Sequence, residues 1–190
     1  MTYLKSLLAV SFSAFIGACS SAPAADGPQD EFFAALKTFC GQTHTGKVTS
    51  EDEADADWRK EVLVVGPVSC EKNEIRMPLA VGANTSRTWI VTRGDSSLTL
   101  KHDHRHDDGS PDAVTNYGGT TASVGTAERQ EFPVDEFSID LFKREGLAAS
   151  VTNTWAFEAM PGERLAYELS RPPVDGKRRF FRAEFDLTAK

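Results

Sequence analysis

The chain reads VTNTWAFEA over residues 151–159, and every second residue of this stretch belongs to one side of an extended strand. Side chains alternate between the two faces of a β-strand, so Val151, Asn153, Trp155, Phe157 and Ala159 share a face. The same alternation places together Leu165, Tyr167 and Leu169 in one later stretch, and Phe181, Ala183, Phe185 and Leu187 in another. One packed face and one solvated face are typical of antiparallel sheet.

Segments with this period of two occupy most of the chain. Turn-forming residues separate them, as at Gly82-Ala83-Asn84 and Pro161-Gly162. The predicted strands are residues 45–50, 61–70, 74–81, 87–93, 97–106, 113–117, 121–126, 148–159, 164–171 and 179–188. The acidic segment 51–57 is predicted to be a surface loop.

Two segments have helical periodicity instead. Phe32, Phe33, Leu36 and Phe39 fall on one face of residues 30–40, a short amphipathic helix that Gly41 ends. Residues 134–146 form the second helix, with Asp135 as its N-cap. The sequence therefore predicts a mainly β protein, an antiparallel meander barrel of eight to ten strands with a short N-terminal helix and one helix near 135–145.

The stretch 39–46, FCGQTHTG, follows a short helix and leads into the meander. This arrangement resembles the calycin group, which includes lipocalins and fatty-acid-binding proteins and whose first strand follows a Gly-x-Trp motif. The chain has Gly41 but no Trp until Trp58, so the resemblance is one of topology. Residues 36–188 also resemble a family of secreted proteins of Gram-negative bacteria, through the stretches SRTW (86–89), LKHDHRH (100–106), NYGG (116–119) and RQEFP (129–133). That second resemblance implies no particular activity.

The N-terminus has the features of an export signal. A short start carrying Lys5 precedes an apolar run over residues 7–16, which is too short to span a bilayer. The run ends in Ile16-Gly17-Ala18-Cys19, which resembles the lipobox of bacterial lipoproteins. The resemblance implies a signal peptide over residues 1–18, lipid on Cys19, a tether over residues 19–29 and a single β-barrel domain over residues 30–190.

The lipobox also implies a location. Ser20 and Ser21 follow the cysteine, with no Asp, which in the enterobacterial pattern sorts a lipoprotein to the outer membrane, facing the periplasm; a periplasmic or secreted protein is the alternative. With Cys19 lipidated, Cys40 and Cys70 remain as a pair. The periplasm is oxidising, so a disulfide between them is expected, the alternative being two buried thiols.

The net charge of the chain argues against nucleic acid as a partner. Its formal net charge is −7 at pH 7. Nucleic-acid-binding proteins carry a cationic surface, which this composition does not favour. The expected partners are therefore the membrane, through the lipid anchor, and a small-molecule ligand.

Three of the four histidines, His102, His104 and His106, lie at alternate positions of one predicted strand. Leu98 and Leu100 precede them in the same row, so the register predicts that all three rings face the interior. Interior imidazoles can bind a metal, donate to an anionic ligand, or act as acid and base near neutral pH. They can also simply pair with neighbouring carboxylates near a strand end.

These observations favour a binding module whose interior holds a small amphiphile or anion. The ligand-binding residues predicted are His102, His104, His106, Arg87, Tyr117 and Trp155. An enzyme that uses a cavity histidine as general base, and a purely structural envelope lipoprotein, are the alternatives. The sequence leaves open whether a metal is bound. The aspartates around Gly109 lack the spacing of an EF-hand calcium loop.

Overall fold

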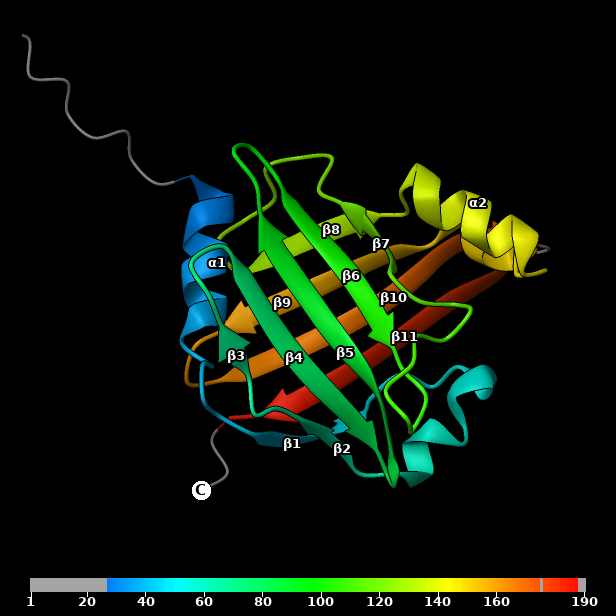
Figure 1. Ribbon diagram of the computed structural model, residues 1–190, viewed down its shortest axis with the longest axis horizontal. Coiled ribbons are helices and arrows are strands. Elements are labelled where there is room, and N and C mark those ends of the chain that lie inside the picture. The colour runs from blue at the N-terminus through cyan, green and yellow to red at the C-terminus, as the bar shows by residue number, and fades with distance from the viewer. Residues whose placement is uncertain (1–26, 175, 188–190) are drawn as a thin grey trace, which may run out of the picture.

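The computed structural model describes residues 27–174 and 176–187, and the predicted signal peptide and Cys19 lie outside them. The described chain is mainly β, as predicted, and its antiparallel strands form one sheet that curves into a nearly closed barrel (Figure 1). The strands are β1 (His44–Val48), β2 (Leu63–Val65), β3 (Ser69–Cys70), β4 (Glu74–Val81), β5 (Asn84–Arg93), β6 (Leu98–His104), β7 (Tyr117–Thr120), β8 (Arg129–Pro133), β9 (Thr154–Met160), β10 (Arg164–Val174) and β11 (Lys177–Asp186). Their order in the sheet is β7-β6-β5-β4-β2-β1-β11-β10-β9-β8, and β3 pairs separately with β4.

Helix α1 (Pro28–Lys37) lies at one end of the barrel, and α2 (Glu136–Arg144) lies at the opposite side of the view (Figure 1). Phe32, Phe33 and Leu36 of α1 are buried in the barrel core, so this end is closed by side chains. The short 3₁₀ helices η1 (Glu53–Asp55), η2 (Trp58–Lys60) and η3 (Ala148–Thr152) complete the described elements.

A disulfide ties the C-terminal side of α1 to the sheet. Cys40 and Cys70 are bonded, with their Cα atoms 5.8 Å apart, which confirms the predicted pair. The bond closes a loop of 30 residues. In the chain-entropy description, a crosslink over a loop of this size contributes roughly 3–4 kcal/mol to stability. It fixes the segment that leads from the closed end of the barrel into β1.

The two ends of the sheet meet through two glycines in β7. Gly119 forms a bridge with Val134, which follows β8, and the Gly118 N–H donates to the Ser138 hydroxyl of α2 over 2.7 Å. A Cβ atom on Gly118 would lie 1.8 Å from the Leu100 carbonyl oxygen, and one on Gly119 would lie 1.9 Å from the Pro133 carbonyl oxygen. Only glycine allows neighbouring backbone to come this close, so the pair permits closure of the barrel.

The N-terminus of α2 fastens the same junction. Asp135 is the N-cap, as predicted, and its carboxylate accepts from the Ser138 N–H over 2.9 Å. The carboxylate also pairs with Lys101 of β6 over 2.5 Å. Burial acts most strongly on the pKa of Asp135 and raises it, but the hydrogen bonds from Lys101 and Ser138 together leave it lowered. One side chain therefore joins β6 to α2 across the junction.

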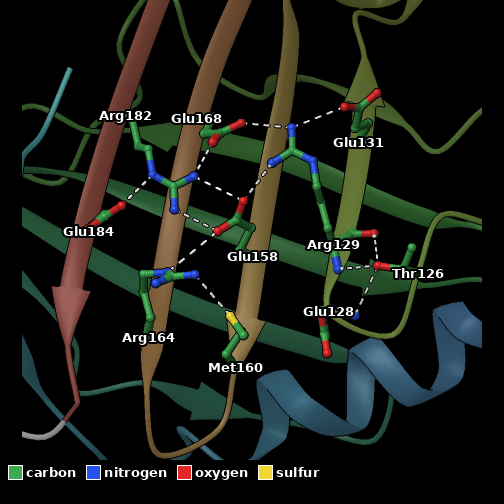
Figure 2. Close-up of polar contacts among 10 residues, drawn as sticks. All are labelled: Thr126, Glu128, Arg129, Glu131, Glu158, Met160, Arg164, Glu168, Arg182 and Glu184. Carbon is green, nitrogen blue, oxygen red and sulfur yellow. Dashed lines mark hydrogen bonds and ion pairs between the residues drawn. The ribbon is translucent and has the colours of Figure 1, made fainter. Parts of the chain in front are cut away.

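Outward-facing side chains of β8, β9, β10 and β11 form a network of ion pairs (Figure 2). Arg182 pairs with Glu158, Glu168 and Glu184. Arg129 pairs with three glutamates as well, namely Glu131, Glu158 and Glu168. The pKa of Glu158 is lowered, chiefly by its hydrogen bond with Arg182. Exposed single ion pairs contribute little, whereas a network of this kind holds several strands in one register.

Several predicted boundaries are wrong. Residues 113–117 and 121–126 are not strands except for Tyr117, and β8 lies instead at Arg129–Pro133. The inward side of β8 carries Gln130, whose amide donates to the carbonyl groups of Val124 and Thr126, so the apolar alternation that marks a strand is interrupted. The predicted strand 61–70 splits at Gly66 and Pro67, and residues 148–152 form η3.

We predict that Gly118→Ala weakens the fold. The new methyl group would overlap the Leu100 carbonyl oxygen, so β6 and β7 must separate, and the free energy of unfolding should fall by about 1–3 kcal/mol or more. Urea denaturation followed by circular dichroism measures the change. Gly94→Ala is the matched control, because its nearest contact to an added Cβ is the Ser97 carbonyl oxygen at 3.3 Å. Equal stability of the two variants would contradict the closure argument.

Candidate functional site

The interior of the barrel changes character along its axis. The inward-facing residues of β5 are, in order along the barrel, Val91, Trp89 and Arg87. Those of β6 are Leu98, Leu100, His102 and His104. The register pairs Val91 with Leu100, Trp89 with His102, and Arg87 with His104. The rows on β10 and β11 run Leu165, Tyr167, Leu169, Arg171 and Phe185, Ala183, Phe181, Arg179, paired in the same order. Each row begins apolar and ends polar or charged.

The polar ends of these four rows surround a cavity of about 380 Å³. Arg93, at the end of β5, pairs with Asp30 of α1 over 2.6 Å, so the apolar ends lie beside α1 and the cavity lies toward the other end. Its wall includes seven aromatic side chains: Trp58, Trp89, Tyr117, Phe142, Trp155, Tyr167 and Phe181. A cavity with apolar walls and a few polar groups is the usual form of a small-molecule site.

His102 is buried and fully hydrogen-bonded in the wall of this cavity. Its Nδ1 lies 3.1 Å from the Tyr117 carbonyl oxygen, and its Nε2 lies 2.7 Å from the Tyr167 hydroxyl. A carbonyl oxygen can only accept, so Nδ1 carries the proton and Nε2 accepts from Tyr167. Burial lowers the pKa of His102 to about 3. The ring is therefore a neutral, fixed part of the wall.

His104 and Tyr117 form the next polar pair toward the mouth. The Tyr117 hydroxyl lies 3.1 Å from His104 Nε2, and the Tyr117 ring stacks on His102 at 4.6 Å between centroids. Burial raises the pKa of Tyr117 to about 12. Burial also lowers the pKa of His104, and nearby Arg87 lowers it further, against the opposite effect of Asp112.

The prediction that His106 faces inward is wrong. Strand β6 ends at His104, and His106 lies in the exposed turn that follows, where its N–H donates to the Ser110 carbonyl oxygen over 2.9 Å. The alternation that orients His102 and His104 applies only while the chain remains a strand. Figure 1 shows the loop after β6 at the end of the barrel away from α1.

The other predicted site residues lie together. Arg87, Tyr117 and Trp155 line the cavity along with His102 and His104. The Arg87 guanidinium lies over the Trp58 ring, 5.1 Å from its centroid. Whether any of these residues contacts a ligand stays a prediction. Within residues 27–174 and 176–187, no group of three or more His, Cys, Asp or Glu side chains is arranged to hold a metal ion.

Sequence reasoning missed four charged residues of the cavity, namely Asp55, Asp112, Arg171 and Arg179. Asp55 belongs to the acidic segment predicted to lie on the surface, yet it is buried, with its carboxylate held by Arg179 and by the Ser50 hydroxyl. The two arginines continue the inward rows of β10 and β11, so the alternation itself contained the signal. An ion pair between residues 124 positions apart has no such signal in the sequence.

Comparisons of the chain with protein-family models, with curated proteins and with solved structures find no match. Among the helices of the described residues, none has the length and apolar character needed to cross a bilayer.

We predict that His102 makes stability depend on pH. Its pKa is lowered in the folded state, so the unfolded chain takes up a proton between about pH 6.5 and pH 3 while the folded chain does not. The free energy of unfolding should fall with decreasing pH across this range, with a slope from this residue approaching about 1.4 kcal/mol per pH unit.

Denaturation at several pH values checks this, with His102→Gln as the comparison, since the other titrating groups contribute equally to both proteins. The wild-type curve should fall more steeply than the variant curve below pH 6.5. Parallel curves would contradict the neutral, buried state of His102.

Proposed function

We propose that this protein is an envelope lipoprotein whose barrel binds a small amphipathic anion. The observation that carries the proposal is the change along the interior rows, from apolar residues at the α1 end, through aromatic rings and a neutral histidine, to arginines at the mouth. An amphipathic anion has the complementary distribution, with an apolar body and a charged end.

The walls suit the apolar body of such a ligand. Trp155 and Tyr167 are buried, and Tyr167 packs against Trp89 with ring centroids 4.4 Å apart. Large aromatic rings contribute much apolar contact area in a defined geometry. A volume of about 380 Å³ lies at the low end of the range for ligand sites, which favours a compact ligand over a long lipid.

The mouth suits an anionic group. Arg87, Arg171 and Arg179 line it, together with the carboxylates Asp55 and Asp112. Arginine presents a planar, permanently charged fork that binds carboxylates and phosphates with good geometry. The arginine side chains therefore supply the recognition that apolar walls alone would lack.

The enzyme alternative has less support from the geometry. A general base needs a free lone pair and a pKa near the working pH. His102 Nε2 already accepts from Tyr167, and the pKa of His102 is about 3. A purely structural role offers no reason for an open, polar-ended cavity in place of a filled core.

We predict that the purified full chain binds 8-anilinonaphthalene-1-sulfonate, an aromatic anion whose fluorescence rises in apolar sites, in its folded state. Val114→Trp, which places a large ring in the cavity wall, should reduce this binding at least several-fold. Val124→Trp is the matched control, because Val124 is 67% exposed and does not line the cavity. Equal binding by both variants, with unchanged near-ultraviolet circular dichroism, would argue against a cavity ligand.

We also propose that Cys19 carries a lipid that anchors the barrel to the outer membrane on its periplasmic face. The Ile16-Gly17-Ala18-Cys19 box after a short apolar run supports this proposal. A diacylglycerol with N-acylation provides more than one acyl chain, which stable anchoring requires.

The corresponding prediction concerns Cys19→Ala, expressed in a Gram-negative host. The wild-type chain should fractionate with membranes and carry the mass of the lipid, whereas the variant should lose both properties. Cys19→Ser serves as a second variant, which also removes the thiol. Membrane association of either variant equal to that of the wild type would contradict lipidation.

A further inference from the structure

Two arginines face each other across β10 and β11 at the mouth of the cavity. Arg171 and Arg179 are direct partners in the antiparallel register and point to the same side. Like charges directly opposite each other destabilise a sheet. The arrangement therefore requires negative charge nearby, and the two arginines differ in whether they have it.

Arg179 has its counter-charge within the protein. It pairs with Asp55 and, over 3.0 Å, with Asp52. Its hydrogen bond with Asp55 is the largest cause of a raised pKa of Arg179. These carboxylates come from η1 and its N-cap, which thus close over one side of the mouth.

Among the described residues, the hydrogen-bond partners of Arg171 are neutral. Its Nε donates to Asn153 Oδ1 over 2.5 Å, and its Nη2 donates to the Ser150 hydroxyl over 3.1 Å. Within the described part of the chain, no carboxylate oxygen lies within 4.0 Å of its guanidinium nitrogens. Burial and then Arg179 lower the pKa of Arg171, and Asp52, already paired with Arg179, opposes them only in part.

The bonds to Asn153 and Ser150 also orient the guanidinium. They use the Nε hydrogen and one Nη2 hydrogen, so the edge formed by Nη1 and the second Nη2 hydrogen has donors to spare. This edge matches the two oxygens of a carboxylate, which arginine binds through two parallel hydrogen bonds. The site is thus positioned before any ligand enters.

The other two cavity arginines, Arg87 and Arg179, have different surroundings from Arg171. Arg87 lies on the other side of the mouth, where it and Asp112 act with opposite sign on the same two groups, His104 and Tyr117. Arg179 is matched by Asp55 and Asp52. Among the described residues, neither Arg87 nor Arg171 has a carboxylate within 4.0 Å. Arg87 donates to the Asn84 amide oxygen over 3.0 Å and lies over the Trp58 ring, whereas Arg171 keeps its Nη edge for one carboxylate.

The neighbouring rings favour a flat body behind that charge. Asn153, which holds Arg171, leads directly into β9 and Trp155, whose ring lies 5.8 Å from that of Tyr117 across the cavity wall. Aromatic pairs prefer stacked or edge-to-face contacts, which a planar ligand satisfies better than a flexible chain.

We propose that the ligand is a planar aromatic monocarboxylate of one or two rings, whose carboxylate binds the Nη edge of Arg171 and whose ring packs against Trp155 and Tyr117. This inference rests on the proposed function and specifies the ligand class and the residue that selects it. Arg171 is the specificity-determining residue, and Asn153 and Ser150 are its positioning residues.

The test compares three probes by calorimetry on the purified full chain: 2-naphthoate, the neutral 2-naphthol with the same rings, and decanoate with the same charge on a flexible chain. The wild type should bind 2-naphthoate most tightly. Arg171→Gln should weaken 2-naphthoate binding by about 30-fold or more, because the bound carboxylate loses its charged partner, and should leave 2-naphthol unchanged.

Arg178→Gln is the matched control, since Arg178 lies on the same hairpin but is exposed and does not line the cavity. It should bind all three probes as the wild type does. Arg171→Lys keeps the charge and loses the fork, so it should weaken 2-naphthoate binding less than Arg171→Gln does. This variant also covers the case in which Arg171→Gln does not fold.

The outcomes separate the two proposals. If decanoate binds as tightly as 2-naphthoate, the aromatic class is wrong and the cavity function stands. If 2-naphthoate affinity does not change in Arg171→Gln and Arg171→Lys, Arg171 is not the anion site. If none of the three probes and no anilinonaphthalene sulfonate binds, the proposed function itself fails.

Discussion

Closure of the barrel at Gly118 and Gly119 is the constraint on which the remaining structure depends. The carbonyl oxygens of Leu100 and Pro133 lie where a side chain would otherwise begin, so β6, β7 and the end of β8 come together only because these two residues have none. Ser138 and Asp135 of α2 then cover the junction with hydrogen bonds. Without closure, β7 and β8 would be open edges, and the inward rows would face solvent instead of a cavity.

Because the barrel is closed, the position of an inward-facing residue along its strand determines how far that residue lies from the mouth. Next to α1 the rows contain Val91, Leu98 and Leu165, which are buried in the common core. In the middle, His102 is neutral because both ring nitrogens are bonded to the wall and burial lowers its pKa. At the mouth, charge becomes tolerable because Arg87 and Arg171 are only partly buried. The chemical gradient of the cavity is therefore a consequence of where each strand ends relative to solvent.

The sequence was sufficient for the elements with a strong period. Alternation correctly predicted the barrel and the inward direction of His102 and His104, and helical periodicity predicted both helices. Arg87, Tyr117 and Trp155, which were predicted to join the two histidines, line the same cavity. It failed for His106 because nothing in a local pattern marks the residue where β6 stops. It failed for β8 because the inward-facing residue Gln130 is polar, which breaks the apolar alternation. The Gln130 amide donates hydrogen bonds to carbonyl groups of the preceding loop. Asp55 was beyond prediction, since its burial depends on Arg179, which is far away in sequence.

The two faces of β10 and β11 show why the state of Arg171 is informative. On the outer face, Arg182 and Arg129 each contact three glutamates, and Arg164 lies 3.6 Å from Glu158 (Figure 2). On the inner face, Arg179 has two aspartates. Each of these four arginines thus has at least one carboxylate partner. Arg171, held by an amide and a hydroxyl beside a cavity, departs from that pattern. An arginine positioned without a counter-charge is disfavoured in the empty barrel, and a bound anion would remove that cost.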